Sequence, residues 1–471
     1  MRPKVAIIGG GIAGATAALY LSRFDLSIEL FEKENSLLNG PPMCHLHAGG
    51  NLYREIDDSQ CLQLLKESLD LLKLYPYAID FRPTLLATPK EDPYDPLELL
   101  PRLQFLQQEY AKLIEMDRDN ARLGDPKEYF SLYSYKDALD LQAKQTPHNP
   151  KNTQEWIIPA LKLLDLQKLK FPLIAVNEYG LNLFRIAANV TLLLQQQKNV
   201  TIHYNQPVSA ITQRANGYTI AQRDFDYLIN AAGFRSGHID DMLGIKRQRL
   251  VEFKAAYVTQ WKSAPASHYP EIIFFGQRGT PQGMAQFTPY PDGYFQLHGM
   301  TEEITLFKNG LAASSKESSQ PKLQDKFLTK IEKGWPQDLV IERSRRAIDH
   351  IARFIPEFKT AQPTPKPLFG AQQIPGKDAA LRASEVSFDA KNYARCEIVK
   401  ASSILSMADA IAYDLTQNGL LDPDAYKKRR SSVEKNSISN EKITEVAKKL
   451  CKMRGYPESL GSVVNGVRER I

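Results

Sequence analysis

The sequence predicts an α/β fold, and three observations carry this prediction. A short apolar run at residues 4–8 precedes a glycine-rich loop and an alanine-rich run, the pattern of a strand, a turn and a helix. Strand-like runs at 253–261, 272–276, 283–289 and 293–301 predict one antiparallel sheet. Segments at 93–170 and after residue 420 are typical of helices, which predicts a helical insertion and a helical C-terminal extension.

Size and composition favour a globular protein with two domains and accessory segments. The chain has 471 residues, of which 43% are hydrophobic and 24% charged. Its apolar stretches are too short or too interrupted to span a bilayer. The four cysteines, Cys44, Cys61, Cys396 and Cys451, form neither a CxxC pair nor a group at metal-ligand spacing. We therefore expect no disulfide framework, no metal and a cytoplasmic location.

The formal net charge of +6 is concentrated in the C-terminal extension. Basic residues outnumber acidic ones after Leu420, notably Lys427, Lys428, Arg429, Arg430, Lys448 and Lys449. Two interpretations remain open. The extension is either a solvated surface helix pair or a peripheral contact for an anionic membrane or a nucleic acid.

The loop after the first strand has the G-x-G-x-x-G spacing of a dinucleotide-binding unit. Gly9 would permit the tight turn, Gly11 would let the backbone approach a pyrophosphate, and Gly14 would let the helix pack on the strand. The N-terminus of the helix at 12–23 would then offer N–H groups to the phosphates. We expect a cofactor to contact Gly9, Gly11, Ile12, Ala13 and Gly14.

An acidic residue follows the second predicted strand, residues 27–31. Glu32 lies eighteen residues beyond Gly14, where such units place a carboxylate that binds the ribose hydroxyls. A carboxylate at this position argues against a 2′-phosphate and therefore against NADP. Glu32 and the adjacent Lys33 are accordingly expected at the cofactor.

A second signal favours FAD over NAD. Predicted strands at 199–204 and 208–212 are followed by an apolar run at 225–233 that ends in small residues. This run resembles the second flavoprotein motif, in which the chain passes close to the cofactor. We expect the cofactor to contact Val208, Ala231, Ala232 and Gly233.

Together these blocks resemble the D-amino-acid oxidase superfamily of FAD-dependent oxidoreductases, most clearly over residues 1–53, 176–237 and 370–415. The resemblance implies a Rossmann-like FAD-binding domain that is interleaved with an α+β substrate domain built on an antiparallel sheet. It implies FAD-binding segments at 1–80, 171–248 and 366–420. The substrate domain would comprise 81–170 and 249–365, and the C-terminal extension 421–471.

Residues 45–52 occupy the place where relatives run a loop of small residues past the flavin ring. In dimethylglycine dehydrogenase a similar His-Ala-Ala-Gly sequence carries a covalently attached flavin. The resemblance therefore adds His47, Ala48 and Gly49 to the expected FAD contacts. We expect non-covalent FAD, with covalent attachment through His47 as the alternative.

The third block departs from its relatives. Amine oxidases of the superfamily carry an arginine where this chain has Gln372 or Gln373, and residues 398–405 lack the expected glycines. A helix that starts near Ser402 and Ser403 could still direct its N–H groups to the flavin O2. Lys400 could add a positive charge there.

The predicted antiparallel sheet supplies candidates for substrate contact. Tyr294, Gln296 and His298 share one face of the last strand, and Gln286 and Tyr290 precede it. His298, Gln286 and Lys400 are the candidate catalytic residues.

Three functions remain open at this point. The first is an oxidoreductase that removes a hydride from a C–H bond next to an amine or hydroxyl of a small molecule, with oxygen, a quinone or a carrier as electron acceptor. The second is a flavoprotein that modifies nucleic acid or binds another macromolecule through its basic tail. The third is a non-catalytic FAD-binding protein.

Overall fold

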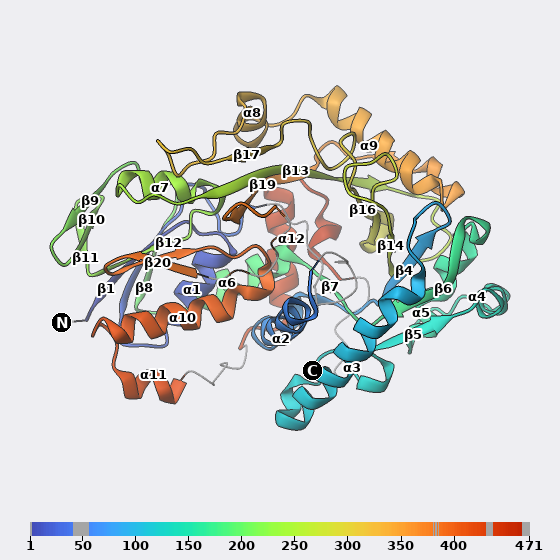
Figure 1. Cartoon of the computed structure of the whole chain (residues 1–471), viewed down its shortest axis with the longest axis horizontal. Coiled ribbons are helices and arrows are strands. Elements are labelled where there is room, and N and C mark those ends of the chain that lie inside the picture. The colour runs from blue at the N-terminus through green and yellow to red at the C-terminus, as the bar shows by residue number, and fades with distance from the viewer. Residues whose placement is uncertain are drawn as a thin grey trace.

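The computed structural model describes residues 2–40, 56–379, 381, 384, 386–429 and 437–463. The six-stranded sheet lies on the left of Figure 1, and the ten-stranded sheet extends from β17 and β13 along the top to β4, β5, β6 and β14 on the right. The predicted α/β fold is confirmed. No helix among the described residues has both the length and the apolar character needed to cross a membrane.

The six-stranded sheet is parallel except at one edge. Only the pairing of β20 with β21 is antiparallel. The order is β20-β21-β12-β1-β2-β8, and the strands span Val386–Ala390, Tyr393–Cys396, Tyr227–Asn230, Lys4–Ile8, Ser27–Phe31 and Val200–His203 respectively. The predicted strands at 4–8 and 27–31 are therefore confirmed at both ends.

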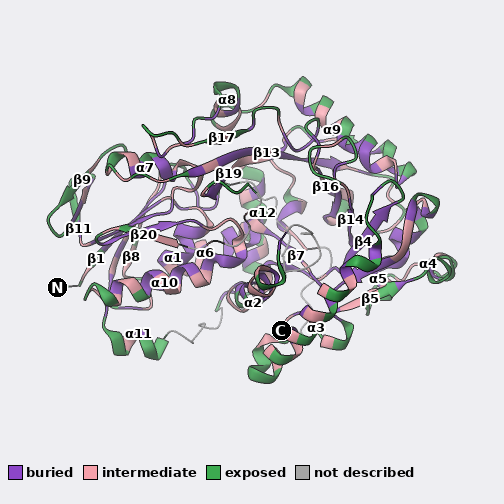
Figure 2. Cartoon of the chain, in the orientation of Figure 1, coloured by how far each residue is buried: buried purple, intermediate pink, exposed green. Residues whose placement is uncertain are grey.

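Successive buried side chains of β1 face opposite sides of this sheet, which lies between two layers. Val5 and Ile7 face a core shared with α1 (Ile12–Leu21), α6 (Leu183–Gln195) and α10 (Ile404–Gln417). Ala6 and Ile8 face a second core that includes residues of a three-stranded sheet, β9 (Ile211–Arg214), β10 (Gly217–Ile220) and β11 (Arg223–Phe225), and of α7 (Ser236–Met242). Figure 2 shows the strands buried and the outward face of α10 exposed.

The ten-stranded sheet contains the strands predicted between residues 253 and 301. Its order is β17-β13-β16-β15-β14-β4-β6-β5, with bounds Leu311–Ala313, Arg249–Gln260, Tyr294–Gly299, Ala285–Pro289, Glu271–Phe274, Thr84–Pro89, Leu169–Val176 and Phe130–Tyr133. The short β18 (Gln362–Pro363) and β19 (Leu368–Pro375) also pair with β13. The pairings are antiparallel except that β14 runs parallel to β4.

Helices cover one face of this sheet with an apolar core. Phe274, Phe287, Phe295 and Leu297 pack there with residues of α4, α5 and α9. The remaining helices and the two-stranded β3-β7 sheet complete the fold: α2 (Asp58–Leu74), β3 (Ile79–Asp80), α3 (Leu100–Met116), α4 (Tyr135–Gln142), α5 (Thr153–Leu163), β7 (Gly180–Leu181), α8 (Asp325–Lys333), α9 (Gln337–Ala352), α11 (Pro423–Arg429) and α12 (Asn440–Met453).

The predicted strand at 208–212 is wrong at its start. The strand β9 begins at Ile211, because its ladder is set by antiparallel pairing of Ile211 with Ile220 across the turn to β10. The predicted domain boundaries stay a prediction.

Candidate cofactor and substrate site

The glycine-rich loop lies where β1 ends and α1 begins. Gly9 has a φ of +103°, and a Cβ there would overlap the carbonyl oxygen of Ala231. A Cβ on Gly14 would overlap the carbonyl oxygen of Gly9. By contrast, a Cβ on Gly11 would meet nothing within 4 Å, and no side chain caps the first turn of α1. Uncapped N–H groups beside open space suit a pyrophosphate.

Glu32 fixes this loop from the end of β2. Its two carboxylate oxygens accept hydrogen bonds from the backbone N–H groups of Gly10 (2.6 Å) and Glu34 (2.8 Å). The side chain is buried, and burial raises the pKa of its carboxyl. The structure thus brings Glu32 and the glycine loop together, as a ribose- and phosphate-binding pair requires.

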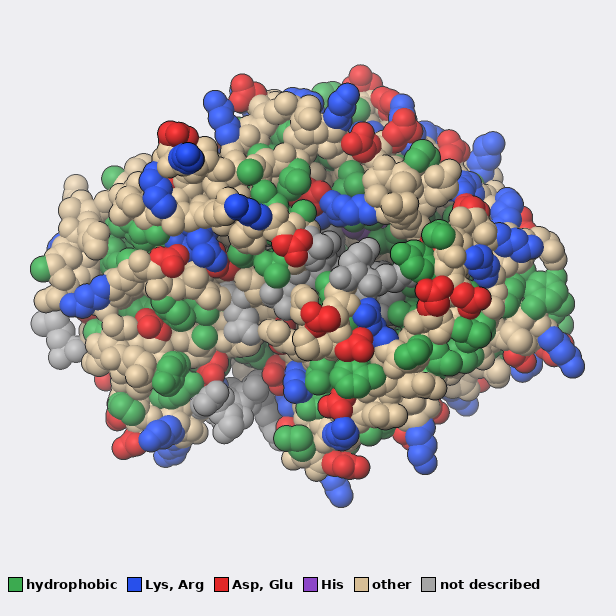
Figure 3. All heavy atoms as spheres, in the orientation of Figure 1, with side chains coloured by type: hydrophobic (Ala, Val, Ile, Leu, Met, Phe, Trp, Pro, Cys, Tyr) green, Lys and Arg blue, Asp and Glu red, His purple; other side chains and the backbone are tan. Residues whose placement is uncertain are grey.

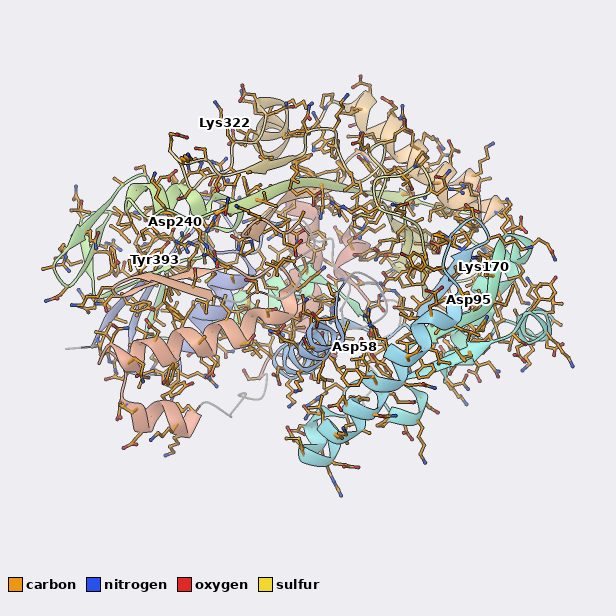
Figure 4. The ribbon with its side chains drawn as sticks, viewed as in Figure 1. Asp58, Asp95, Lys170, Asp240, Lys322 and Tyr393 are labelled. Carbon is orange, nitrogen blue, oxygen red and sulfur yellow. The ribbon has the colours of Figure 1, made fainter. Side chains whose placement is uncertain are left out.

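The segment predicted as the second flavoprotein motif lies beside the glycine-rich loop. Ala231 packs between Gly9 and Gly14, and Gly233 has a φ of +59° with open space around it. The buried Asn230 donates to the hydroxyl of Tyr393 at 2.8 Å, and that hydroxyl donates to Asp240 at 2.6 Å. Asp240 and Tyr393 are labelled in Figure 4, in the half that holds the six-stranded sheet. This network holds the end of β12 in place.

Ser402 and Ser403, the predicted flavin contacts of the third block, lie at the start of α10. A 3-10 turn at Ala401–Ser403 precedes α10, and no side chain caps it. Ser403 donates to Glu67 of α2 at 2.6 Å. The hydroxyl of Ser402 is buried, and it has no hydrogen-bond partner among the described residues. A buried hydroxyl without a partner next to uncapped N–H groups fits a ligand with carbonyl or ring-nitrogen acceptors, such as a flavin.

Six other predicted residues remain, three within the described residues and three outside them. The exposed Lys33 pairs with Glu34 at 3.0 Å. Val208 is half-buried and packs against the core that contains Ile8 and Phe31. Lys400 is half-buried at the start of the 3-10 turn. His47, Ala48 and Gly49 lie outside the described residues, as does Cys44.

The predicted substrate residues share the polar face of the ten-stranded sheet. Gln286 pairs with His298 and Thr288 with Gln296 in the β15–β16 ladder, so all four lie on one face. The Nδ1 of His298 lies 3.4 Å from the Oε1 of Gln286. The hydroxyl of Tyr290 lies 3.5 Å from the Oε1 of Gln296.

A buried ionic group that the sequence did not predict supports these residues. The side-chain amide of Gln286 donates to Glu271, which is fully buried on β14. Arg82 bonds the other oxygen of Glu271 at 3.1 Å and Asp80 at 2.6 Å. Thus Asp80, Arg82, Glu271, Gln286 and His298 form a continuous chain of contacts.

The sequence prediction also missed Lys254. This residue lies on β13, on the face that β13 shares with His298, and its Nζ lies 2.7 Å from Glu252 and 3.0 Å from the Oε1 of Gln372. Arg278 also pairs with Glu252. A signal was present, because Glu252 and Lys254 are charged residues two apart between apolar residues of the strand.

The three cysteines in the described part of the chain, Cys61, Cys396 and Cys451, are buried free thiols. In the same residues no cluster of three or more His, Cys, Asp or Glu side chains could hold a metal ion.

Comparison with known proteins identifies similar sequences and folds. A family model described as FAD dependent oxidoreductase (DAO) matches residues 4–373. The sequence has no significant match among curated proteins.

Several solved structures share the fold at low sequence identity. Glycine oxidase from Geobacillus kaustophilus is 12% identical, with a TM-score of 0.53 over 91% of this chain and 95% of its own. Glycerol-3-phosphate dehydrogenase from Bacillus halodurans, solved with FAD, is 12% identical, with a TM-score of 0.56 over 97% and 73%. L-amino acid deaminase from Proteus vulgaris is 13% identical, with a TM-score of 0.55 over 90% and 96%.

Proposed function

The chain belongs to the DAO family of FAD-dependent oxidoreductases, and from this premise we propose that it removes a hydride from a C–H bond next to an amine or hydroxyl of a small anionic molecule. The names of the similar structures support this class, since they include glycine, L-amino acids and glycerol-3-phosphate. FAD supplies the two-electron acceptor for such a reaction. Oxygen, a quinone or a carrier would then receive the electrons.

The observation that carries the proposal is the hydrogen-bond order around His298. The amide nitrogen of Gln286 donates to Glu271 and lies 3.2 Å from the hydroxyl of Thr288. Its oxygen therefore faces His298, and only a protonated Nδ1 can donate to that oxygen. A proton on Nδ1 would place the lone pair of the neutral ring on Nε2. A neutral imidazole of this kind can accept the proton of a substrate amine or hydroxyl.

The buried ionic group on the same face would stabilise the imidazolium that forms when His298 accepts a proton. Asp80, Arg82 and Glu271 together carry one net negative charge when all three are ionised. That charge lies behind Gln286 and would stabilise a positive His298. The ionic group would thus orient His298 through Gln286.

The charge around Lys254 supports the proposal that the substrate is an anion. With Arg278 and Glu252 it forms a group with one net positive charge on the polar face of the sheet. Its bond to Gln372 places a cation beside the segment where amine oxidases of the family carry an arginine. We propose that Lys254 replaces that arginine in holding a carboxylate or phosphate.

No observation favours the alternative of nucleic-acid modification. On the face drawn in Figure 3, basic and acidic side chains are interspersed over the surface. In the C-terminal helix α12, both Lys442 and Lys449 pair with Glu445. Part of the basic charge predicted to contact a polyanion is therefore compensated locally.

An anaerobic substrate panel tests the proposal. We expect amino acids, N-methylamino acids, 2-hydroxy acids or polyol phosphates to bleach the flavin absorbance, whereas the neutral amide or alcohol counterpart of the reactive compound bleaches it poorly. The change His298→Gln should slow bleaching by about 10²–10⁴-fold because a general base is lost. Flavin content should stay unchanged.

His148→Gln is the matched control, since His148 is exposed. It should reduce the flavin at the wild-type rate. Failure of every compound in the panel would exclude the substrate class, and a wild-type rate in the His298 variant would exclude His298 as the base.

A further inference from the structure

The C-terminal segment 437–463, which lies beyond the matched family region, packs against α6, a helix that covers the six-stranded sheet. The fully buried Arg185 of α6 donates to the hydroxyl of Thr444 at 2.8 Å and to the carbonyl of Gly461 at 3.3 Å, and it also bonds Asn440. Asn182 donates to the carbonyl of Leu460 at 2.7 Å. Residues of α12, including Ile443 and Cys451, share a core with α6. The segment is therefore a fixed part of the fold.

From this anchor one side chain reaches the loop that follows β2. Arg454, at the end of α12, donates from NH1 to the carbonyl of Leu38 at 2.8 Å. Its NH2 donates to the carbonyl of Leu37 at 2.6 Å and to the hydroxyl of Ser36 at 3.3 Å. Charge-assisted hydrogen bonds of this kind are stronger than neutral ones. They hold residues 36–38, which lie in neither a helix nor a strand.

The loop held by Arg454 also contacts Gly10, whose N–H bonds the carboxylate of Glu32 that is proposed to bind the ribose. The backbone N–H of Leu38 donates to the carbonyl of Gly10 at 2.9 Å. The side chain of Leu37 packs so closely on Gly10 that a Cβ there would meet it at 2.6 Å. The N–H of Gly10 in turn bonds Glu32. Arg454, the 36–38 loop, Gly10 and Glu32 therefore form one connected unit.

We propose that Arg454 is a positioning residue for the cofactor, through which the C-terminal segment completes the adenosine end of the FAD site. Without the guanidinium group, residues 36–38 lose three hydrogen bonds, those to the carbonyls of Leu37 and Leu38 and to the hydroxyl of Ser36. The loop then samples positions in which Glu32 and Gly10 no longer present the ribose and phosphate contacts together. This inference depends on FAD binding and is independent of the substrate proposed above.

The test compares FAD affinity in Arg454→Ala and Lys449→Ala holoenzymes. Lys449 is a cation on the same helix, but it is exposed and pairs only with Glu445 among the described residues. We expect the dissociation constant of FAD, followed by fluorescence of released flavin, to rise about tenfold in Arg454→Ala and to stay unchanged in Lys449→Ala.

Two fragments of the cofactor separate local positioning from general destabilisation. After removal of FAD, ADP affinity should fall by a similar factor in Arg454→Ala, while FMN affinity should stay at the wild-type value. Unchanged FAD and ADP affinities would overturn the proposal. An equal loss of ADP and FMN affinity, together with a lower unfolding temperature of the FAD-free protein, would also overturn it.

Discussion

Gly11 and Gly14 lie three residues apart, at the N-cap and in the first turn of α1, but their surroundings differ. Gly14 contacts the Gly9 carbonyl, whereas Gly11 faces open space with an extended ψ of −176° that any residue can adopt. We expect Gly14→Ala to lower the free energy of unfolding of the FAD-free protein by about 1–3 kcal/mol through overpacking. Gly11→Ala should change it by less than about 1 kcal/mol.

The effect of Gly11→Ala on FAD affinity should differ from its effect on the free energy of unfolding. A methyl group at Gly11 would occupy the space needed by the pyrophosphate, so Gly11→Ala should weaken FAD binding by about tenfold or more despite its normal fold. Urea unfolding and FAD titration measure the two effects. Wild-type FAD affinity in Gly11→Ala would show that the phosphates bind elsewhere.

The glycines and Glu32 could be predicted from the sequence because their spacing is local. One loop and the two strands that flank it determine where these residues lie. Arg454 and Arg82 carried no such signal. Arg454 reads as an ordinary basic residue at a helix end, and its contact with Leu37 joins residues more than four hundred apart in sequence. Only the folded chain brings them together.

At the scale of elements, the start of α10 contains two adjacent serines with opposite surroundings. Ser403 bonds Glu67, while Ser402 is buried and unpaired among the described residues. We expect Ser402→Ala to leave the FAD-free protein as stable as the wild type or more stable by up to about 1 kcal/mol, because an unsatisfied hydroxyl is removed. The same change should weaken FAD binding and shift the flavin spectrum.

Ser403→Ala is the matched control. It removes a hydrogen bond to a carboxylate and should destabilise the FAD-free protein by about 1.5–3 kcal/mol. Thermal unfolding without FAD and titration with FAD distinguish the pair. If Ser402→Ala binds FAD as the wild type does, its hydroxyl is not a cofactor contact.

Elements whose limits follow from the pattern of residue types were predicted well, and those set by pairing with another strand were not. The predicted first strand coincides with β1 because apolar residues end abruptly at Gly9. The start of β9 depends on its partner β10, so the sequence around Val208 could not define it. Likewise, the sequence predicted an antiparallel sheet but gave no sign that β14 would pair in parallel with β4.

At the scale of the whole molecule, two buried histidines predict a pH dependence. Burial lowers the pKa of His268 and of His350 below the ordinary value of 6.5. The unfolded chain therefore binds protons below about pH 6.5 that the folded chain does not. The contribution of these histidines to the free energy of unfolding is fully present above this pH. It decreases as the pH falls, by up to about 1.4 kcal/mol per pH unit for each histidine that stays neutral.

His268→Phe isolates one contribution to this dependence. His268 is 3% exposed and packs edge-on against Trp156, so a phenyl ring suits the site. Urea unfolding between about pH 7.5 and about pH 5.5 should give a shallower loss of stability in this variant than in the wild type. Identical slopes would show that His268 does not contribute.

The order of strands in the six-stranded sheet has a consequence for biosynthesis. The first strand made, β1, is paired with β12, which in turn is paired with β21 near residue 396. At translation rates of about 5–20 residues per second, β21 is completed roughly 20–80 s after β1. During that interval the nascent chain exposes unpaired strand edges. FAD that binds before Arg454 has been synthesised would lack the support that this residue gives to the 36–38 loop.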